Sequence, residues 1–552
     1  MKKINIILII FVLLLSTFAI KALFTPGFFT SHDGILHIAR QHYYIQALLD
    51  GQFPPRWAGG AYNNFGYPLF IFSYRLPYFF GSIFYFLGTT VVDSVKITFI
   101  AGFLLSGITM YLLLNSYYGK IPAFIGTIIY QFAPYRFLNI FVRAALAESF
   151  VFVFLPLVFL AIYKLSKQDK IGWRWIILGS ISLAAVILSN LTVLLVFVPC
   201  IISNILYLNY KKLLKRTVIR NYSYMFLLAI ALSSYYLVPT VAESSWISYS
   251  NIINIDFIKD SFLNLRQLLY SKWGYGWMRA AEGAMSFQLG IAQWTIAITS
   301  ILLLFWKGAT KGKNKFISSD FIYWLVIFFF SIFMMLKISF PVWNFLKTLW
   351  NIQFVWRFLS LAIFSVAFLA ALIAKNIKQK DVKWSFVVII TILCLYANRN
   401  HWRINQAQAW SLEKYLQVAG STASYDEFRP IWVDKNISSI KKPKVELSSI
   451  TSNITVNQNL SNRLDFVINV DRPDLVKINT LYYPGWNLSV NNKIIELKPS
   501  AEGLIEIPVS SGRNNFILSF SETPLRLVSD FISLFALLLI PVLWRKASYE
   551  KN

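Results

Sequence analysis

Charged residues, histidine and cysteine are all scarce in this chain. Only 14% of the 552 residues are charged, with four histidines and two cysteines, whereas soluble domains carry roughly 25% charged residues. Cys200 and Cys394 each lie inside an apolar run, which argues against a disulfide framework or a zinc site. The sequence also lacks a phosphate-binding Gly-rich loop, a Gly-x-Ser-x-Gly elbow and a His-Glu-x-x-His motif. The familiar signatures of soluble enzymes are therefore missing.

Apolar residues, in contrast, are abundant. They make up 57% of the chain, aromatic residues make up 17%, and the mean hydropathy is +0.55. Long apolar runs recur up to residue 398 and again at 525–544, which is typical of helices that cross a bilayer. The sequence predicts a mostly α-helical polytopic membrane protein with about twelve spans, at 4–24, 94–114, 120–135, 147–165, 173–190, 191–209, 222–242, 286–306, 319–340, 354–374, 384–398 and 525–544.

The basic residues indicate how the spans are oriented. The formal charge is +27, and the basic residues lie in short loops between apolar runs, which is typical of topology-setting charge and not of a nucleic-acid interface. These loops contain Lys2 and Lys3; Lys164, Lys167 and Lys170; Lys211, Lys212, Lys215, Arg216 and Arg220; Lys307, Lys311, Lys313 and Lys315; Lys375, Lys378, Lys380 and Lys383; and Arg545 and Lys546. Because basic loops tend to stay inside, both termini are predicted to be cytoplasmic. The first apolar run is interpreted as an uncleaved span, with a cleaved signal peptide as the alternative.

One apolar segment, 69–88, is predicted not to cross the membrane. It carries Arg75 and Pro77 near its middle, and a full crossing would place every later basic loop outside. We therefore predict a juxtamembrane or re-entrant hairpin, in which a buried Arg75 needs an anionic partner.

The segments predicted to lie outside the cytoplasm are 25–93, 136–146, 243–285, 341–353 and 399–524. Only the last is long enough for a domain. It contains runs of period two separated by turn residues, which predict a small antiparallel β-sandwich. The predicted organisation is a transmembrane domain over 1–398, a β-rich extracytoplasmic domain over 399–524, and a last span with a cytoplasmic tail over 525–552.

The first outer loop is predicted to begin with an amphipathic helix on the membrane surface. Residues 32–50 have helical periodicity, with Asp33, His37 and Arg40 on the polar side. Ser31 is the expected N-cap, so Asp33 falls in the first turn, where the helix dipole favours a carboxylate. Three of the four histidines lie close together here, which favours a functional site. The alternative is that Asp33 only complements the helix terminus.

A second polar site follows the third predicted span. Glu148 enters the next span, where an ionisable group is expensive without a role or a partner, and Arg143 is its candidate partner. An interface ion pair is the structural alternative. Topology places this site on the same side of the membrane as Asp33.

Other charged residues are candidates at the same membrane level. Arg56 lies in a loop rich in proline and aromatic residues, Glu243 follows a span, and Arg357 lies near the outer end of another span. An arginine in such a place suits a phosphate. For Arg279, beside Glu282 in the 243–285 loop, simple anchoring at the interface is the preferred interpretation.

The chain resembles the GT-C superfamily of membrane glycosyltransferases. The shared layout is an N-terminal span, an acidic residue at the start of a large first outer loop, juxtamembrane helices and a second acidic site after the third span. Asp33 and Glu148 match the two acidic positions. More narrowly, the segments 31–37, 54–57, 64–68, 143–148, 482–486 and 523–526 are similar to bacterial membrane proteins labelled "6-pyruvoyl-tetrahydropterin synthase-related". A pterin synthase is a small soluble zinc enzyme, and its histidine set is missing from this sequence.

The resemblance implies an inverting transfer of a sugar from a polyprenyl-phosphate donor to a cell-envelope acceptor on the extracytoplasmic face. Asp33 would take the proton of the acceptor hydroxyl, and Glu148 would be the second catalytic acid group. The residues implied in substrate binding are His32, His37, Arg56, Arg143, Arg357 and Glu243, with the arginines holding the leaving phosphate. No cofactor is expected beyond a divalent metal, for which the implied ligands are Asp33, His37 and Glu148. A single acidic residue in place of an acidic pair argues against that metal.

Two other functions stay open at this point. A transporter or flippase of lipid-linked saccharides would share the spans and the intramembrane charge, but it predicts paired halves or inverted repeats, which the sequence does not show. A non-catalytic scaffold of the same fold is the other alternative. Intact Asp33 and Glu148 argue against it.

Overall fold

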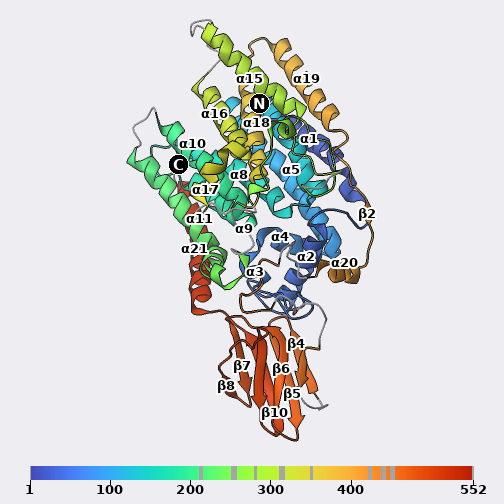
Figure 1. Cartoon of the computed structure of the whole chain (residues 1–552). Helices are drawn as coiled ribbons and strands as arrows, with labels where there is room; N and C mark the ends of the chain where they lie inside the picture. The colour runs from blue at the N-terminus through green and yellow to red at the C-terminus, as the bar shows by residue number, and fades with distance from the viewer. Residues whose placement is uncertain are drawn as a thin grey trace.

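The computed structural model is an elongated helical domain with a small β domain at one end (Figure 1). It describes residues 2–210, 215–249, 258–278, 283–309, 318–347, 352–420, 426–434, 437, 443–447 and 454–549. The basic residues Lys211, Lys212, Lys311, Lys313 and Lys315, together with Arg279 and Glu282, lie outside the described residues.

Each span predicted from the sequence coincides with a helix. These helices are α1 (Lys2–Ala19), α5 (Val91–Tyr118), α6 (Lys120–Gln131), α8 (Leu146–Leu165), α9 (Trp173–Ser189), α10 (Leu191–Asn209), α11 (Arg216–Ala242), α15 (Ile291–Ala309), α16 (Ser319–Met335), α18 (Leu359–Asn376), α19 (Lys380–Asn398) and α21 (Pro524–Tyr549). Among the described residues, seven helices are long and apolar enough to cross a membrane, and five shorter apolar helices accompany them. The number of spans itself stays a prediction.

Shorter helices and turns connect these elements. They are η1 (Lys21–Phe24), α2 (Gly34–Leu49), α3 (Leu69–Phe72), α4 (Leu76–Phe86), α7 (Pro134–Phe137), the π-helical η2 (Leu138–Val142), η3 (Ser244–Trp246), α14 (Leu265–Leu269), η4 (Lys337–Ser339), α17 (Phe340–Leu346), η5 (Val355–Phe358) and α20 (Leu412–Ala419).

The centre of the helical domain is α18, which is almost completely buried. It packs against α6 and α16, while α8 packs against α5 and α9. Small residues allow the close approach, because a Cβ atom added at Gly126 of α6 would lie only 2.6 Å from the Ala367 carbonyl of α18. Close packing through small residues is how helices associate where lipid removes the hydrophobic drive between them.

The apolar segment 69–88 forms two short helices, α3 and α4, broken at 73–75. At about 1.5 Å per residue, α4 is too short to cross a hydrocarbon core of about 30 Å. The anionic partner expected for Arg75 is not found among the described residues. Arg75 Nε instead donates to the Phe70 carbonyl (2.6 Å), and its guanidinium lies over the rings of Tyr235 and Tyr236. Aromatic faces and a carbonyl therefore replace the predicted carboxylate.

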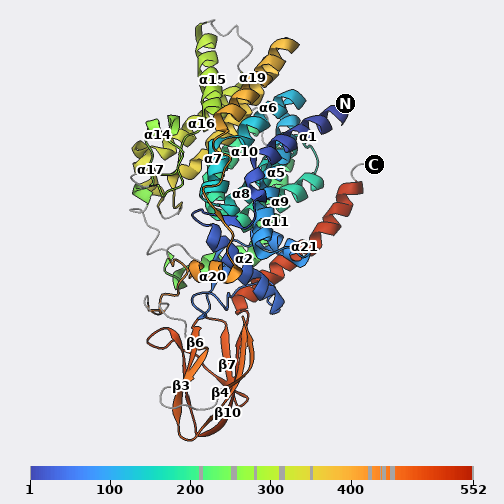
Figure 2. The ribbon, with the colours of Figure 1, turned by 90° about the vertical axis from the view of Figure 1, so that its right-hand side faces the viewer.

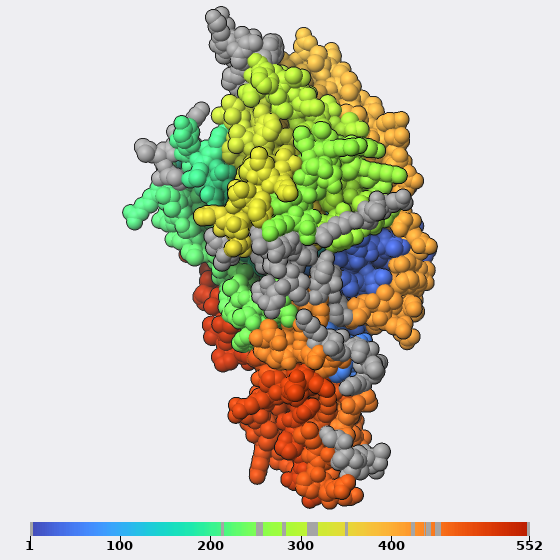
Figure 3. Space-filling view, viewed as in Figure 1, coloured from blue at the N-terminus to red at the C-terminus, as the bar shows by residue number. Residues whose placement is uncertain are grey.

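The β domain consists of two antiparallel sheets, and it projects from the helical domain (Figure 3). Their strands are β3 (Val445–Leu447), β4 (Ile454–Leu460), β5 (Arg463–Val470), β6 (Asp474–Leu481), β7 (Trp486–Val490), β8 (Lys493–Ile495), β9 (Leu504–Val509) and β10 (Gly512–Phe520). The strand orders are β4-β5-β10-β7-β8 and β3-β6-β9. Alternate residues of β5 are buried, and Phe466 stacks on Phe516 of β10 at 4.6 Å. A separate short pair, β1 (Phe28–Phe29) with β2 (Ala407–Gln408), ties the segment after α1 to the segment before the β domain.

Candidate active site

Two segments far apart in the sequence are joined by backbone hydrogen bonds near the start of α2. The His32 N–H donates to the Val142 carbonyl (2.9 Å), and the Asp33 N–H donates to the Arg143 carbonyl (3.0 Å). The second segment is irregular, because the π-helical η2 runs to Val142 and Ala144 has a left-handed φ of 53°. Such features are rare in ordinary backbone and frequent at functional sites. The two polar sites of the sequence therefore form one site in the fold.

Glu148, in the first turn of α8, is buried and fully hydrogen-bonded. Its Oε1 accepts from Arg143 Nη2 (3.0 Å) and from Arg357 Nε (3.1 Å). Its Oε2 accepts from the Tyr135 hydroxyl (2.9 Å) and from Asn139 Nδ2 (3.1 Å). The predicted Arg143–Glu148 pair is confirmed. Because four donors surround this carboxylate, it is poorly placed to exchange a proton. Its contacts instead hold the Arg143 and Arg357 guanidinium groups in place.

Of the two arginines held by Glu148, Arg357 keeps a hydrogen-bonding group for a further partner, whereas Arg143 Nη1 already donates to Asn139 (2.5 Å). The Arg143 guanidinium lies over the Trp356 ring at 4.3 Å, which orients it by a cation–π contact. Arg357 Nη2 donates weakly to Gln353 (3.3 Å), and its buried Nη1 has no acceptor among the described residues. A buried N–H group without an acceptor is costly, so this position favours an incoming anion.

Asp33 immediately precedes α2, which begins at Gly34. The expected N-cap, Ser31, is two residues too early, because its hydroxyl donates to the Phe29 carbonyl instead (3.2 Å). Asp33 occupies the N-cap position, but its side chain makes no capping bond, and its carboxylate has no partner among the described residues. Burial raises the pKa of Asp33, and the positive charges of Arg143 and Arg40 oppose this rise. The carboxylate is thus available for proton transfer.

The two histidines beside Asp33 are each hydrogen-bonded through one ring nitrogen. His37 Nδ1 lies 2.8 Å from the Tyr78 hydroxyl, and Tyr78 stacks on Tyr74 at 5.4 Å. His32 Nε2 lies 3.0 Å from the Tyr275 carbonyl, so this nitrogen carries the proton. Burial lowers the pKa of both imidazoles, for His37 well below its usual value.

The residues suggested for a divalent metal do not fit one. The Glu148 oxygens are taken by four donors, so this carboxylate is not free to bind a metal. His37 contacts Tyr78 through Nδ1, and its buried Nε2 has no partner among the described residues. Within the described part of the chain, no group of three or more histidine, cysteine, aspartate or glutamate residues is arranged to hold a metal ion. We derive no step of the chemistry through a metal.

A cavity of about 910 Å³ collects these groups. Of the residues predicted from sequence, it is lined by His32, Asp33, His37, Arg143, Glu148 and Arg357. It is also lined by residues whose sequence context carried no signal, including Tyr74, Asn190, Tyr249, Trp277, Phe354 and Glu427. Arg40 lines it as well, and helical periodicity had already placed Arg40 on the polar face of α2.

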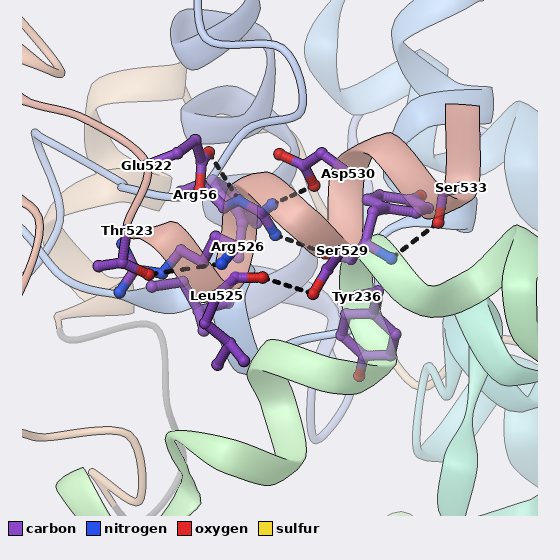
Figure 4. A network of polar contacts seen from close by, with 12 residues as sticks. Arg56, Tyr236, Glu522, Thr523, Leu525, Arg526, Ser529, Asp530 and Ser533 are labelled. Carbon is purple, nitrogen blue, oxygen red and sulfur yellow. Dashed lines mark hydrogen bonds and ion pairs between the residues drawn. The ribbon is translucent and has the colours of Figure 1, made fainter. Parts of the chain in front are cut away.

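Arg56 does not line this cavity. It is buried at the junction with the β domain, where Nε donates to Glu522 (2.9 Å), Nη2 donates to Asp530 (2.6 Å) and Nη1 donates to the Tyr235 carbonyl (2.6 Å). Figure 4 shows the guanidinium between the two carboxylates, beside the start of α21. Its predicted contact with substrate has no support in this geometry, because its donors are already used.

Glu243 also lies outside the cavity, in a second ion pair at the same junction. Its two oxygens accept from Arg526 Nε (2.7 Å) and Nη2 (2.8 Å), and the Tyr483 hydroxyl donates to Oε2 (2.9 Å). Arg526 and Glu243 are both almost completely buried. This group of Glu243, Arg526 and Tyr483, called the fork below, joins the end of α11 to the start of α21 and to the loop after β6. The geometry therefore favours a structural role over the predicted substrate contact.

Comparisons with known proteins leave the class open. No model of a protein family matches the chain, and no curated protein matches its sequence. Among solved structures, the crystal structure of ArnT from Cupriavidus metallidurans bound to undecaprenyl phosphate is similar at 10% identity, covering 83% of this chain and 97% of that chain with a TM-score of 0.29. A TM-score this low does not establish a common fold, so the likeness assigns neither a class nor an activity. Membership of the pterin synthase-related group stays a prediction.

Proposed function

We propose that this chain is a membrane glycosyltransferase of the GT-C type. It transfers a sugar from a polyprenyl-phosphate donor to a hydroxyl acceptor of the cell envelope, on the extracytoplasmic side of the membrane. The proposal includes catalysis by Asp33 and recognition of the donor phosphate by Arg143 and Arg357.

The observation that carries the proposal is the pairing of unlike groups in one cavity. Asp33, whose carboxylate has no hydrogen-bond or ion-pair partner among the described residues, lines the same cavity as two arginines that are fixed by a shared glutamate. The apolar helices indicate a membrane setting. A base beside a positively charged clamp is the arrangement that a displacement reaction with a phosphate leaving group requires.

The chemistry follows from this arrangement. The acceptor hydroxyl oxygen attacks the anomeric carbon of the sugar, and its proton passes to Asp33. The bond between the anomeric carbon and the phosphate oxygen breaks, and the polyprenyl phosphate departs with the bonding electron pair. The charge that develops on the leaving oxygen is stabilised by Arg143 and by Arg357 Nη1, which are already in place. A single displacement inverts the configuration at the anomeric carbon.

Replacing Asp33 by asparagine is expected to abolish transfer without loss of stability. Loss of a general base lowers a rate by about 10²–10⁴-fold. The carboxylate is partly desolvated and has no ion-pair partner among the described residues, so removing its charge costs no contact. The measurement uses wild type and variant in proteoliposomes, with radiolabelled polyprenyl-phosphate sugars and a cell-envelope extract, beside melting curves of both proteins.

Asp93→Asn is the matched control, because the half-buried Asp93 pairs only locally, with Thr90 and Lys96 at the start of α5. It should transfer at the wild-type rate. Equal transfer by the Asp33 variant would remove Asp33 from the mechanism. If no donor is consumed but lipid-linked sugar crosses the bilayer, the protein is a flippase.

The pH dependence of transfer should report the same carboxylate. Because burial raises the pKa of Asp33 above 3.8, the rate should fall on acidification at a pH above that of an ordinary aspartate. The contribution of Asp33 to folding stability depends on pH in the opposite direction from the transfer rate. A raised folded-state pKa means that the native protein binds the proton more tightly than the unfolded chain, so this contribution is present at low pH and is lost as the pH rises through the folded pKa. The residual transfer of Asp33→Asn can be measured at high enzyme concentration. If its rate falls on acidification at the same pH as in wild type, the titrating group is not Asp33.

A further inference from the structure

A second hollow lies on a different face of α11 from the active-site cavity. It has a volume of about 600 Å³ and is bounded by α9, α11 and α21. The active-site cavity uses Tyr236 and Thr240 of α11, whereas this groove uses Tyr224, Leu228 and Ala231. At 100° per residue these two sets point to different sides of the helix. The groove is therefore separate from the proposed catalytic site.

The shape of the groove follows from the course of α21. Figure 2 shows α21 leaning away from the other helices toward the C-terminus. It packs mainly on α11 and touches α9 over a smaller area. Only 17% of its apolar window is buried, and Phe531 and Phe535 on the groove side are 62% and 65% exposed.

The groove requires an apolar occupant. Its walls are almost entirely hydrocarbon and aromatic, including Ile176, Leu228, Val528 and Phe535. Water needs two to four polar partners to stay in such a place, and these walls expose almost no polar surface. An empty hollow would forfeit the dispersion contacts of its lining. In a bilayer the available filler is a lipid chain lying along α21.

One end of the groove carries positive charge and interfacial aromatic rings. Trp173 stacks on Tyr224 at 5.6 Å, and Lys546 Nζ lies 5.8 Å from the Trp173 ring. Arg220 lies one turn before Tyr224, on the same face of α11. The nearby acid Asp169 already pairs with Lys215. Tryptophan and lysine gather where a helix meets lipid head groups, and the positive charge selects an anionic one.

We propose that the groove between α9, α11 and α21 binds one anionic glycerophospholipid. Its acyl chain lies against Leu228 and Phe535, and its phosphate is held by Lys546 and Arg220 at the C-terminal end of α21. The lipid completes the packing of α21, which also carries the Arg526 and Asp530 contacts of the β-domain junction. This site does not depend on the proposed transferase activity.

Native mass spectrometry of the full-length protein, released from detergent after incubation with phosphatidylglycerol or phosphatidylcholine, tests the proposal. Wild type should retain one phosphatidylglycerol molecule at collision energies that remove phosphatidylcholine. Lys546→Gln with Arg220→Gln should weaken phosphatidylglycerol retention about tenfold or more, because each basic group near a head group contributes to binding. Ala536→Phe, which fills the groove, should abolish retention of both lipids.

Lys378→Gln with Lys383→Gln is the matched control, because Lys378 lies just before α19, Lys383 lies in its first turn, and neither lines the groove. It should bind like wild type. Equal retention of the two lipids by wild type would overturn the head-group assignment. If Ala536→Phe binds the lipid as well as wild type does, the groove is not the binding site. Because that change also alters buried packing, the two surface substitutions in Lys546 and Arg220 carry the test independently.

Discussion

Replacing Glu148 by glutamine is expected to destabilise the helical domain strongly and to abolish transfer. The change removes the negative charge that Arg143 and Arg357 share, and both guanidinium groups are buried. Breaking a buried ion pair by removing one partner costs about 3–5 kcal/mol, because the remaining charge is left uncompensated. Here two positive charges are left. Melting of the purified protein in nanodiscs measures the loss of stability, and the transfer assay measures the loss of rate.

The comparison variant is Glu502→Gln, which removes a half-exposed carboxylate that pairs with Lys477 in the β domain. A surface pair of this kind contributes less than about 1 kcal/mol. Adding Arg357→Gln to Glu148→Gln should recover part of the lost stability, because one of the two uncompensated charges is then removed. A single Glu148 variant that melts like wild type would show that the arginines do not depend on this carboxylate.

Replacement of Asp33 and of Glu148 should therefore differ in its effect on stability, although both changes abolish transfer and sequence alone treats the two residues as acidic groups of one site. Asp33 lacks a partner among the described residues, so its loss removes chemistry and leaves stability intact. Glu148 has four donors, so its loss removes stability first. Sites that keep a charged group without a partner usually sacrifice stability for function.

The fold was largely predictable because its signals are local. Apolar runs long enough to cross a bilayer identified each major helix, and residues alternating in polarity identified strands such as β5. Arg75 and Pro77 correctly marked the break in the 69–88 segment. The expected partner of Arg75 was wrong, because tyrosines 235 and 236 replace a carboxylate and no local pattern announces such a contact.

The site was only partly predictable, for the same reason. Arg143 and Glu148 are five positions apart, so their pairing could be inferred. Arg56 meets Glu522 across 466 positions and Glu243 meets Arg526 across 283. Nothing in either neighbourhood distinguishes an arginine that binds phosphate from one that anchors a domain. Arg56 and Arg526 are both buried, and both donate to carboxylate oxygens, as an arginine in a phosphate site donates to phosphate oxygens.

The second large effect is expected at the junction of the two domains. Glu243→Gln should loosen the β domain from the helical domain, because Arg526 would keep a buried charge without its carboxylate and Tyr483 would lose a charged acceptor. The expected loss is again about 3–5 kcal/mol. Melting curves should shift downward, and limited proteolysis should cut between the β domain and α21 at lower protease concentration than in wild type.

A triple variant, Glu243→Leu with Arg526→Met and Tyr483→Phe, distinguishes a structural role from a role in binding. Replacing all the partners of a buried ion pair by apolar groups of similar size is often neutral or stabilising, because no polar group is left unsatisfied. The triple variant should therefore melt near wild type and resist proteolysis again. If it also transfers sugar, the fork is an anchor between α11, α21 and the β domain. If it is stable but inactive, Glu243 contacts substrate, as the sequence alone had predicted. A triple variant as unstable as Glu243→Gln would mean that the junction needs the ion pair itself.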